Sequence, residues 1–294
     1  MYKMVIWGIG AVYNRHVNLL KYYEAKKEIE VIALTSSNPP SVRSIDGYKV
    51  IESREIRTLD FDFILVMNDG AATEIRETIT NMGVDSEKLL HYKILEIPNL
   101  IFDEYVKLKR SRISIISNNC WGGTVYNTLG MECLSPFKNL FLEDDSYLRM
   151  LGNLEYYLGC EPDEGGFGTD IHSGKVYPIL KLDDVLVHCN HDDIFETAIK
   201  DWKRRVKKIN RNNLFIEMYT DNRLSAECFC QLKYSNKVCF VSFPSNEKEL
   251  YQLELLPGQK ELWEVVISSA RNGSNSLSYN VVELLNGRNC RRYR

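Results

Sequence analysis

Long apolar runs are absent from this sequence. No stretch of about 18 uncharged apolar residues occurs, which is close to the length that a membrane-spanning helix needs. The start, MYKMVIWGIGAVYN, also lacks a basic segment followed by such a run, and a secretory signal needs that arrangement. We therefore expect a cytoplasmic protein without membrane insertion.

An excess of positive charge is absent as well. The formal net charge is -3 and the sequence pI is near 6.0. No global basic field would therefore attract phosphate backbones or anionic lipid. Nucleic acid is not an expected partner.

The sequence further lacks the paired CxxC spacings that hold zinc and any repeat of fixed period. Because no secretory signal is found, we expect the cysteines to be reduced and mostly buried. They are Cys120, Cys133, Cys160, Cys189, Cys228, Cys230, Cys239 and Cys290.

The sequence does have an ordinary globular composition, with 44% hydrophobic and 26% charged residues. Its 294 residues are many for one core, since domains usually hold roughly 100 to 200 residues. Pro98 and a charged stretch precede a new apolar run, which places a domain boundary near Lys109. The prediction is an α/β fold of two domains, a Rossmann-like parallel sheet over residues 1–108 and a further α/β sheet domain over residues 109–294.

The first domain begins with a strand, a glycine turn and a helical pattern. KMVIWGIG ends in Gly8 and Gly10. Glycines at such a turn let the backbone approach a phosphate at the start of the following helix. Gly8 and Gly10 are therefore candidate cofactor-binding residues.

Two features of a dinucleotide fingerprint are missing from this turn. Tyr13 stands where the third glycine of GxGxxG would be, and the second strand ends in TSSN, residues 35–38, without the acidic residue that binds a ribose hydroxyl. Two readings stay open, a nucleotide pocket or a purely structural strand–helix turn.

The segments VIWGIG, DGYKVIESREI and FDFILVMNDGAATEIRETITNMGVDSEKLL resemble the small Rossmann-like domains that are attached to bacterial sugar-modifying enzymes. This resemblance implies a role in carbohydrate or nucleotide-sugar metabolism.

The second domain also alternates strand and helix patterns. Residues 161–175 are expected to form a glycine-rich loop, and Asp221 is a candidate N-cap for the helix that follows it. The expected strands cover residues 113–117, 139–142, 176–180, 184–188, 213–219 and 237–243, and the other expected helices cover residues 124–131, 146–158 and 195–209.

The segment ISIISNNCWGG brings polar groups to the end of the strand at 113–117, where parallel sheets bind ligands. Side-chain amides, an indole N–H and glycine backbone N–H groups are donors that sugar and nucleotide sites use. The alternative is structural, with the tryptophan as a core anchor. The candidate ligand-binding residues are Asn118, Asn119, Trp121, Gly122 and Gly123.

Within the same segment, Cys120 is a candidate nucleophile. His188 or His191 would be its base if the fold brought one of them close. Cys120 and His188 are therefore candidate catalytic residues. The alternative is that Cys120 is a small buried hydrophobic residue.

The run HCNHDD offers imidazole and carboxylate groups of the kind that bind metals. Asp192 and Asp193, however, stand where a helix should start, and acids there favour capping. We therefore favour capping and predict no metal site. For Glu143–Asp145 (EDD), binding of a divalent ion and capping of the next helix both stay open.

Arg204 and Arg205 belong to a cationic stretch at the end of the helix 195–209. Arginine can bind a phosphate with two hydrogen bonds, so both residues are candidate phosphate ligands. Cations at this end of a helix also complement its dipole, which is the alternative.

The segments SNNCWGG, SPFKNLFLEDDSYLRMLGNLEYYL, YPIL, VHCNHDDIFETAIKDWKRRVKKIN and VCFVS together resemble a bacterial family of unknown function that is often labelled exopolysaccharide biosynthesis protein. The label implies a pathway and does not identify a reaction. From this resemblance and the position of SNNCWGG at a strand end, we predict a cytoplasmic transferase that acts on a small molecule in surface-polysaccharide biosynthesis. Its substrate would be a nucleotide-sugar, another activated sugar or a glycan precursor. Two alternatives stay open, a cysteine-dependent acyltransferase or hydrolase and a non-enzymatic nucleotide- or sugar-binding module. The sequence predicts neither a specific cofactor nor an oligomeric state.

Overall fold

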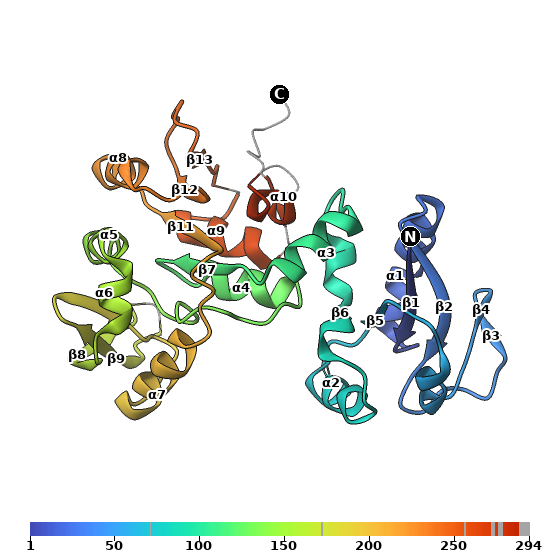
Figure 1. Cartoon of the computed structure of the whole chain (residues 1–294). Coiled ribbons are helices and arrows are strands. Elements are labelled where there is room, and N and C mark those ends of the chain that lie inside the picture. The colour runs from blue at the N-terminus through green and yellow to red at the C-terminus, as the bar shows by residue number, and fades with distance from the viewer. Residues whose placement is uncertain (71, 172, 256, 272–273, 276–278, 288–294) are drawn as a thin grey trace. The chain divides into compact units, whose positions relative to one another are not determined.

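The computed structural model of the chain describes residues 1–70, 72–171, 173–255, 257–271, 274–275 and 279–287 (Figure 1). His172 and Cys290, which belong to the predicted loop and the cysteine set, lie outside the described residues. The chain forms two compact units. Unit 1 comprises Met1–Val106 and Thr128–Gly130, and unit 2 comprises Lys107–Asn127 and the described residues that follow Gly130.

Unit 1 is built on a parallel four-stranded sheet in the order β2-β1-β5-β6. Its strands are rich in buried apolar residues, as strands covered on both faces are. The elements are β1 (Tyr2–Trp7), α1 (Ala11–Ala25), β2 (Ile29–Thr35), β3 (Ser44–Ile45), β4 (Tyr48–Lys49), the 3₁₀ helix η1 (Ser53–Thr58), β5 (Phe63–Val66), α2 (Ala72–Asn81), η2 (Ser86–Lys88), β6 (Leu89–His91), η3 (Tyr92–Glu96) and α3 (Phe102–Ser111), whose last residues belong to unit 2.

The strand order of unit 1 creates a crevice at the centre of its sheet. The chain passes from β1 through α1 to β2 on one side, and β5 then pairs with the other side of β1. The small hairpin β3–β4 lies beside β2 (Figure 1). The connections that leave β1 and β5 therefore diverge at the carboxyl ends of these strands.

Unit 2 contains a second parallel sheet in the order β13-β12-β11-β7 and an antiparallel sheet in the order β10-β9-β8. The elements are β7 (Ser114–Ser117), α4 (Trp121–Thr128), α5 (Asp144–Gly152), α6 (Leu154–Gly159), β8 (Asp163–Thr169), β9 (Val176–Leu182), β10 (Val185–His188), α7 (Phe195–Val206), β11 (Leu214–Tyr219), α8 (Arg223–Gln231), β12 (Lys237–Val241), β13 (Leu250–Gln252), α9 (Leu262–Arg271), β14 (Ser274–Asn275), β15 (Tyr279–Asn280) and α10 (Val281–Leu285).

The two faces of the parallel sheet in unit 2 have separate cores, because alternate residues of a strand point to opposite faces. Ile216 and Met218 of β11 belong to the larger apolar cluster, together with residues of α5, α7, α8 and the antiparallel sheet. Phe215 points the other way and stacks on Trp121 of α4, with ring centroids 5.9 Å apart. Glu217 shares the face of Phe215 and is fully buried.

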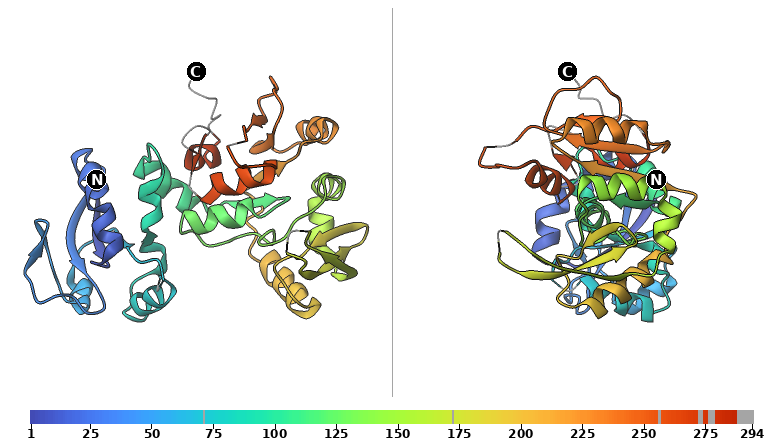
Figure 2. Two further views of the ribbon diagram at one scale, coloured as in Figure 1. Left: turned by 180° about the vertical axis from the view of Figure 1, so that it is seen from behind. Right: turned by 90° about the vertical axis from the view of Figure 1, so that its left-hand side faces the viewer.

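The predicted α/β class is confirmed, and parallel sheets form the centre of both units. The prediction of a glycine-rich loop at 161–175 is wrong for Asp163–Thr169, because these residues form β8, which pairs with β9 as a hairpin (Figure 2). Gly168 is needed there because a Cβ atom at this position would lie 2.5 Å from the Tyr177 ring. Glycine in a strand can thus mark a close approach of a neighbour instead of a loop.

Other predictions for unit 2 also differ in part from the structure. The helix expected at 146–158 is interrupted at Asn153, whose φ of -148° and ψ of 56° are not helical. The strand expected at 139–142 is reduced to a single bridge between Phe141 and His188. The N-cap of α8 is Asn222, because its side chain accepts hydrogen bonds from two backbone N–H groups of the first turn. Asp221 is therefore not the cap.

A search of the described helices for membrane spans finds none with the length and apolar character that crossing would require.

Candidate functional site

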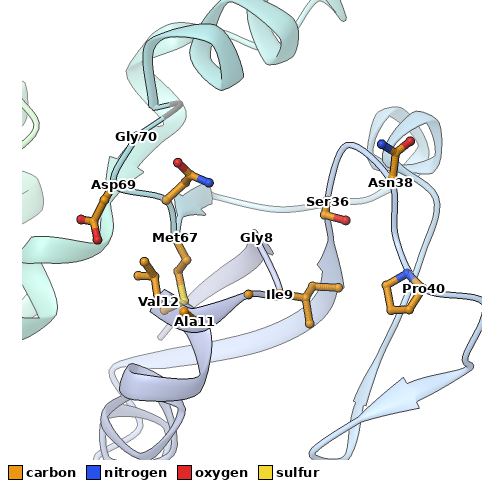
Figure 3. Close-up of a pocket in the computed structure, with 12 residues that line it drawn as sticks. Gly8, Ile9, Ala11, Val12, Ser36, Asn38, Pro40, Met67, Asp69 and Gly70 are labelled. Atoms are coloured by element: carbon orange, nitrogen blue, oxygen red, sulfur yellow. The ribbon is translucent and has the colours of Figure 1, made fainter.

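A pocket of about 640 Å³ lies at the carboxyl ends of β1, β2 and β5 in unit 1 (Figure 3). Open parallel sheets bind ligands in such a crevice, where the connections diverge. Its lining comes from the segments after the three strands, residues 8–12, then Ser36, Asn38 and Pro40, then residues 67–70.

The two candidate glycines have different roles in this pocket. Gly8 has φ +117°, and a Cβ atom there would lie 2.5 Å from the Met67 carbonyl oxygen, so the backbone itself requires glycine. Gly10 is the N-cap of α1, and a Cβ atom there would meet nothing within 4 Å. Gly10 therefore leaves open space at the helix start, where N–H groups favour an anion.

The third fingerprint position is occupied by a side chain that serves the fold. Tyr13 is buried, and its hydroxyl donates to Asp46 Oδ2 at 2.9 Å, which ties α1 to the turn of the β3–β4 hairpin. The end of β2 presents Ser36 and Asn38 to the pocket (Figure 3). These neutral groups can hydrogen-bond a hydroxyl, although neither is the acidic ribose ligand of the common fingerprint.

Asp69 is an acidic residue in the lining of the pocket. It accepts hydrogen bonds from the Tyr92 hydroxyl and from Arg15 Nη2, the latter at 3.2 Å. The Tyr92 hydrogen bond, followed by the Arg15 guanidinium, lowers the pKa of Asp69. Because Arg15 pairs with this carboxylate, the negative charge near the start of α1 is partly compensated.

In unit 2, the two asparagines after β7 bond to the neighbouring strand β11. The Asn118 side chain pairs with both backbone groups of Tyr219, donating to its oxygen and accepting from its nitrogen at 3.1 Å each. Asn119 Nδ2 donates to Glu217 at 3.1 Å from Oε1 and 3.0 Å from Oε2. Both asparagines are buried, and their ligand-binding role stays a prediction.

Asn119 also fixes the start of α4, because its Oδ1 accepts from the backbone nitrogen of Trp121 at 2.6 Å. Its partner Glu217 is an acid in the middle of an apolar strand. Burial raises the pKa of Glu217 to about 8, and the Asn119 hydrogen bond offsets part of that effect. No role is predicted for Glu217 from the sequence, although a single acidic residue within the apolar run LFIEMY is a signal that could have identified it.

Trp121 packs in the core of unit 2. Its ring is 0% exposed, and Nε1 donates to the Tyr279 hydroxyl at 2.8 Å. The side chain has no accessible surface in this structure, which favours the structural alternative, and ligand binding by Trp121 stays a prediction.

Gly122 and Gly123 let α4 approach its neighbours. A Cβ atom at Gly122 would lie 2.6 Å from Ser117 Oγ and 2.8 Å from Ile115 Cγ2, and one at Gly123 would lie 3.2 Å from Lys138 Cγ. The glycine pair therefore has a packing function in addition to the backbone N–H groups that it offers.

Replacing Gly122 by alanine is expected to lower the free energy of unfolding by about 1–3 kcal/mol, because the added methyl group overpacks the contact between α4 and β7. Urea denaturation would measure this change. Gly152→Ala, an exposed α5 position with nothing within 4 Å of its Cβ atom, is the matched control and should stay within about 0.5 kcal/mol of the unmodified protein. Equal stability of both variants would contradict this packing role.

Cys120 lies directly before α4, and the structure brings His191 to it. Cys120 Sγ and His191 Nε2 are 3.6 Å apart. Burial raises the pKa of the Cys120 thiol to about 11. His188, the histidine named in the sequence prediction, instead stacks on Phe141 with ring centroids 4.4 Å apart, and its Nδ1 lies 3.3 Å from the Tyr177 hydroxyl. His191 is therefore the imidazole next to the thiol.

The predicted phosphate ligands on α7 already have partners. Arg204 Nη2 lies 2.8 Å from Asp201 Oδ1, Arg205 pairs with the other oxygen of Asp201, and Arg205 Nη1 donates to the Lys138 carbonyl at 2.9 Å. These contacts favour the structural reading, and phosphate binding by Arg204 and Arg205 stays a prediction.

The capping predicted for Asp192 and Asp193 is wrong. The helix α7 begins at Phe195 with Ile194 as its N-cap, and no side chain of the described structure caps it. Asp193 pairs with Lys175 at 2.9 Å, and the Asp192 backbone nitrogen donates to Cys189 O at 2.9 Å.

The acids around 144 form part of the α5 start. Glu143 is the N-cap position of α5, without a side-chain cap. Asp144 Oδ2 accepts from the Thr220 hydroxyl at the end of β11, at 2.5 Å. Across the described ranges, no group of three or more His, Cys, Asp and Glu side chains is placed to hold a metal ion.

The chain is similar to protein families for which the descriptions name no activity. The family described as "Domain of unknown function (DUF1919)" matches residues 91–286, and the family described as "C2185-like, N-terminal" matches residues 1–90. An uncharacterized protein of Haemophilus influenzae (strain ATCC 51907 / DSM 11121 / KW20 / Rd) is 31% identical over 172 residues, which cover 57% of this chain and 80% of the relative. The predicted kinship with a bacterial family of unknown function is thereby confirmed, and its exopolysaccharide label stays a prediction. Because the DUF1919 match over residues 91–286 covers well over half of this chain, the chain belongs to the DUF1919 family.

Proposed function

We propose that the chain binds a nucleotide-type ligand, a nucleotide or nucleotide-sugar, in the pocket of unit 1, and that it acts as a transferase on an activated sugar or glycan precursor in surface-polysaccharide biosynthesis. The observation that carries the binding part is the position of the pocket, at the crevice between β1, β2 and β5. The transferase part rests on the sequence resemblances.

The size and polarity of the pocket suit such a ligand. Ligand pockets commonly measure roughly 300–1,000 Å³, and this one has about 640 Å³. A phosphate group would take the open space at Gly10, where first-turn N–H groups and the helix dipole of α1 favour negative charge. Ribose or sugar hydroxyls would meet Ser36 and Asn38 in the part of the lining that follows β2.

A leucine at Gly10 is expected to abolish ligand binding while the protein still folds. A Cβ atom at Gly10 meets nothing within 4 Å, and the residue lines the pocket, so the substitution fills the pocket without replacing a core contact. Leucine is a poor N-cap, so a stability loss of roughly 1 kcal/mol is expected. Thermal shift of the full chain with nucleoside diphosphates and nucleoside diphosphate sugars measures binding, because a ligand of the native state raises Tm with its concentration.

Gly152→Leu, at an exposed position of unit 2, is the control and should keep the full ligand-dependent shift. Equal shifts in the Gly10→Leu and control proteins would place the ligand elsewhere. No shift with any compound of the panel would remove the binding proposal.

The transferase part needs a separate measurement. The ligand that gives the shift, labelled in its sugar, should pass the label to a glycan precursor in the presence of the full chain. A ligand that binds but transfers no label to any precursor would favour the non-enzymatic binding module.

A further inference from the structure

We propose that unit 2 carries a cysteine-dependent acyl-transfer site, in which Cys120 attacks the carbonyl carbon of an activated acyl ester or thioester and His191 is the general base. The two side chains come from different loops, the one between β7 and α4 and the one between β10 and α7. Cys120 Sγ and His191 Nε2 are 3.6 Å apart. A thiol beside an imidazole is the arrangement that activates a nucleophilic cysteine.

Neither residue of the pair is fully buried. His191 is exposed and Cys120 is partly exposed. The neighbours Asn119 and Trp121 are buried and hold the loop in place. Of the residues 118–121, Cys120 is thus the one that is not buried.

The segment at residues 140–142 holds the two loops together. The backbone nitrogen of Leu142 donates to Asn118 O at 2.9 Å. Phe141 and His188 exchange two backbone hydrogen bonds of 2.9 Å. One short segment is therefore bonded to the residues just before Cys120 and just before His191. These hydrogen bonds join the two loops that carry the nucleophile and the base, and a site needs such support to keep its geometry.

The resting sulfur is a thiol and needs a base. Burial raises the pKa of Cys120 to about 11, so the thiolate is scarce near neutral pH. His191 Nε2 would accept the proton as the sulfur attacks. This differs from a preformed thiolate–imidazolium pair, for which the pKa of the thiol would be lowered.

The reaction proceeds in two balanced steps. In the first, the Cys120 S–H proton passes to His191, the S–C bond forms, the bond from the acyl carbon to the leaving oxygen or sulfur breaks, and His191 returns the proton to that leaving group. In the second, water or an alcohol hydroxyl attacks the thioester carbonyl and gives its proton to His191. The S–C bond then breaks, and the sulfur takes the proton back.

The start of α4 provides donors for the negative oxygen that forms in both steps. The Trp121 N–H is bonded to Asn119 Oδ1. The next two N–H groups, of Gly122 and Gly123, belong to the first turn and have no acceptor within the helix. Backbone N–H groups in this position stabilise oxyanions.

The acylation does not depend on a ligand in unit 1. The acyl-transfer proposal can therefore fail while nucleotide binding is observed, and nucleotide binding can fail while Cys120 is acylated.

The test uses the full chain and p-nitrophenyl acetate near neutral pH. We expect one acetyl group on Cys120, located by peptide mass spectrometry, and release of more than one equivalent of p-nitrophenolate. Cys228, which is exposed on α8, is the internal control and should be acetylated more slowly.

His191→Asn should slow acetylation of Cys120 by roughly 10²-fold or more, which is the usual contribution of a general base. Because His191 is exposed, this variant should fold, and its circular dichroism should match that of the unmodified protein. The proposal is overturned if Cys120 is acetylated no faster than Cys228, or if His191→Asn leaves the rate unchanged. Cys120→Ala should lose both the adduct and the turnover, whereas Cys228→Ala should keep them.

Discussion

Between about pH 5 and pH 8 the protein is expected to lose roughly 2–4 kcal/mol of its free energy of unfolding, and a Glu217→Gln variant should not show this loss. Glu217 belongs to β11 in unit 2 and is fully buried. Burial raises the pKa of its carboxyl from the ordinary value of 4.5 to about 8. Within this window the native state keeps a proton that the unfolded chain has released.

The direction follows from that difference in bound protons. Below about pH 4.5 both states are protonated, and the contribution of this group to stability is fully present. As the pH rises, each unit costs about 1.4 kcal/mol, until the native carboxyl also ionises near pH 8. Acidification should therefore stabilise unit 2. A carboxylate in a salt bridge would have the opposite effect, because acidification would remove its charge and destabilise the protein.

Urea denaturation across this pH range, for the unmodified protein and for Glu217→Gln, measures the effect as a difference between two curves. Glu227→Gln, at an exposed position of α8, is the control and should follow the unmodified protein. Parallel curves for Glu217→Gln and the unmodified protein would show that the carboxyl is ionised in both states.

Replacing Trp121 by alanine is expected to lower the free energy of unfolding by roughly 3–5 kcal/mol, as for other buried aromatic residues. The change removes the ring that stacks on Phe215 and leaves the Tyr279 hydroxyl without the indole donor. Trp121→Phe keeps most of the ring volume and should lose less. The measurement is urea denaturation at constant pH.

Trp263→Ala is the matched control, because this tryptophan of α9 is 37% exposed and its truncation should cost clearly less. The prediction separates the two readings of the SNNCWGG segment. If Trp121 contacted a ligand instead, its truncation would lower the affinity of the protein for that ligand and leave the free energy of unfolding unchanged. If Trp121→Ala retained the stability of the unmodified protein, its role as a core anchor would be refuted.

The fold class was predictable because its signals are local. Runs such as FILV and LFIEMY identify buried strands by composition alone, and the helical spacing between them indicates parallel crossovers. The β8 strand was missed because its glycines resemble a loop in the sequence. A Cβ atom at Gly168 would lie 2.5 Å from the Tyr177 ring, and one at Gly165 would lie 2.9 Å from the Ile179 carbonyl oxygen. Both neighbours belong to the partner strand β9, which the local sequence of β8 does not reveal.

The sites were predictable only where one segment carries them. Gly8 and Gly10 reveal the turn of the unit 1 pocket, but its opposite wall comes from the segment after β5. The partner of Cys120 depends on the bridge between Phe141 and His188, which joins segments distant in sequence. Spacing along the chain could not decide between His188 and His191, and it could not show that Asn119 bonds to Glu217.

The most direct test of the nucleotide-binding claim is hydrogen–deuterium exchange of the full chain with and without a saturating nucleoside diphosphate sugar. Slower exchange is predicted in the three segments that line the pocket of unit 1, residues 8–12, 36–38 and 67–70. The Gly10→Leu variant should show no such protection. Unchanged exchange in these segments, or protection confined to unit 2, would contradict the proposed site.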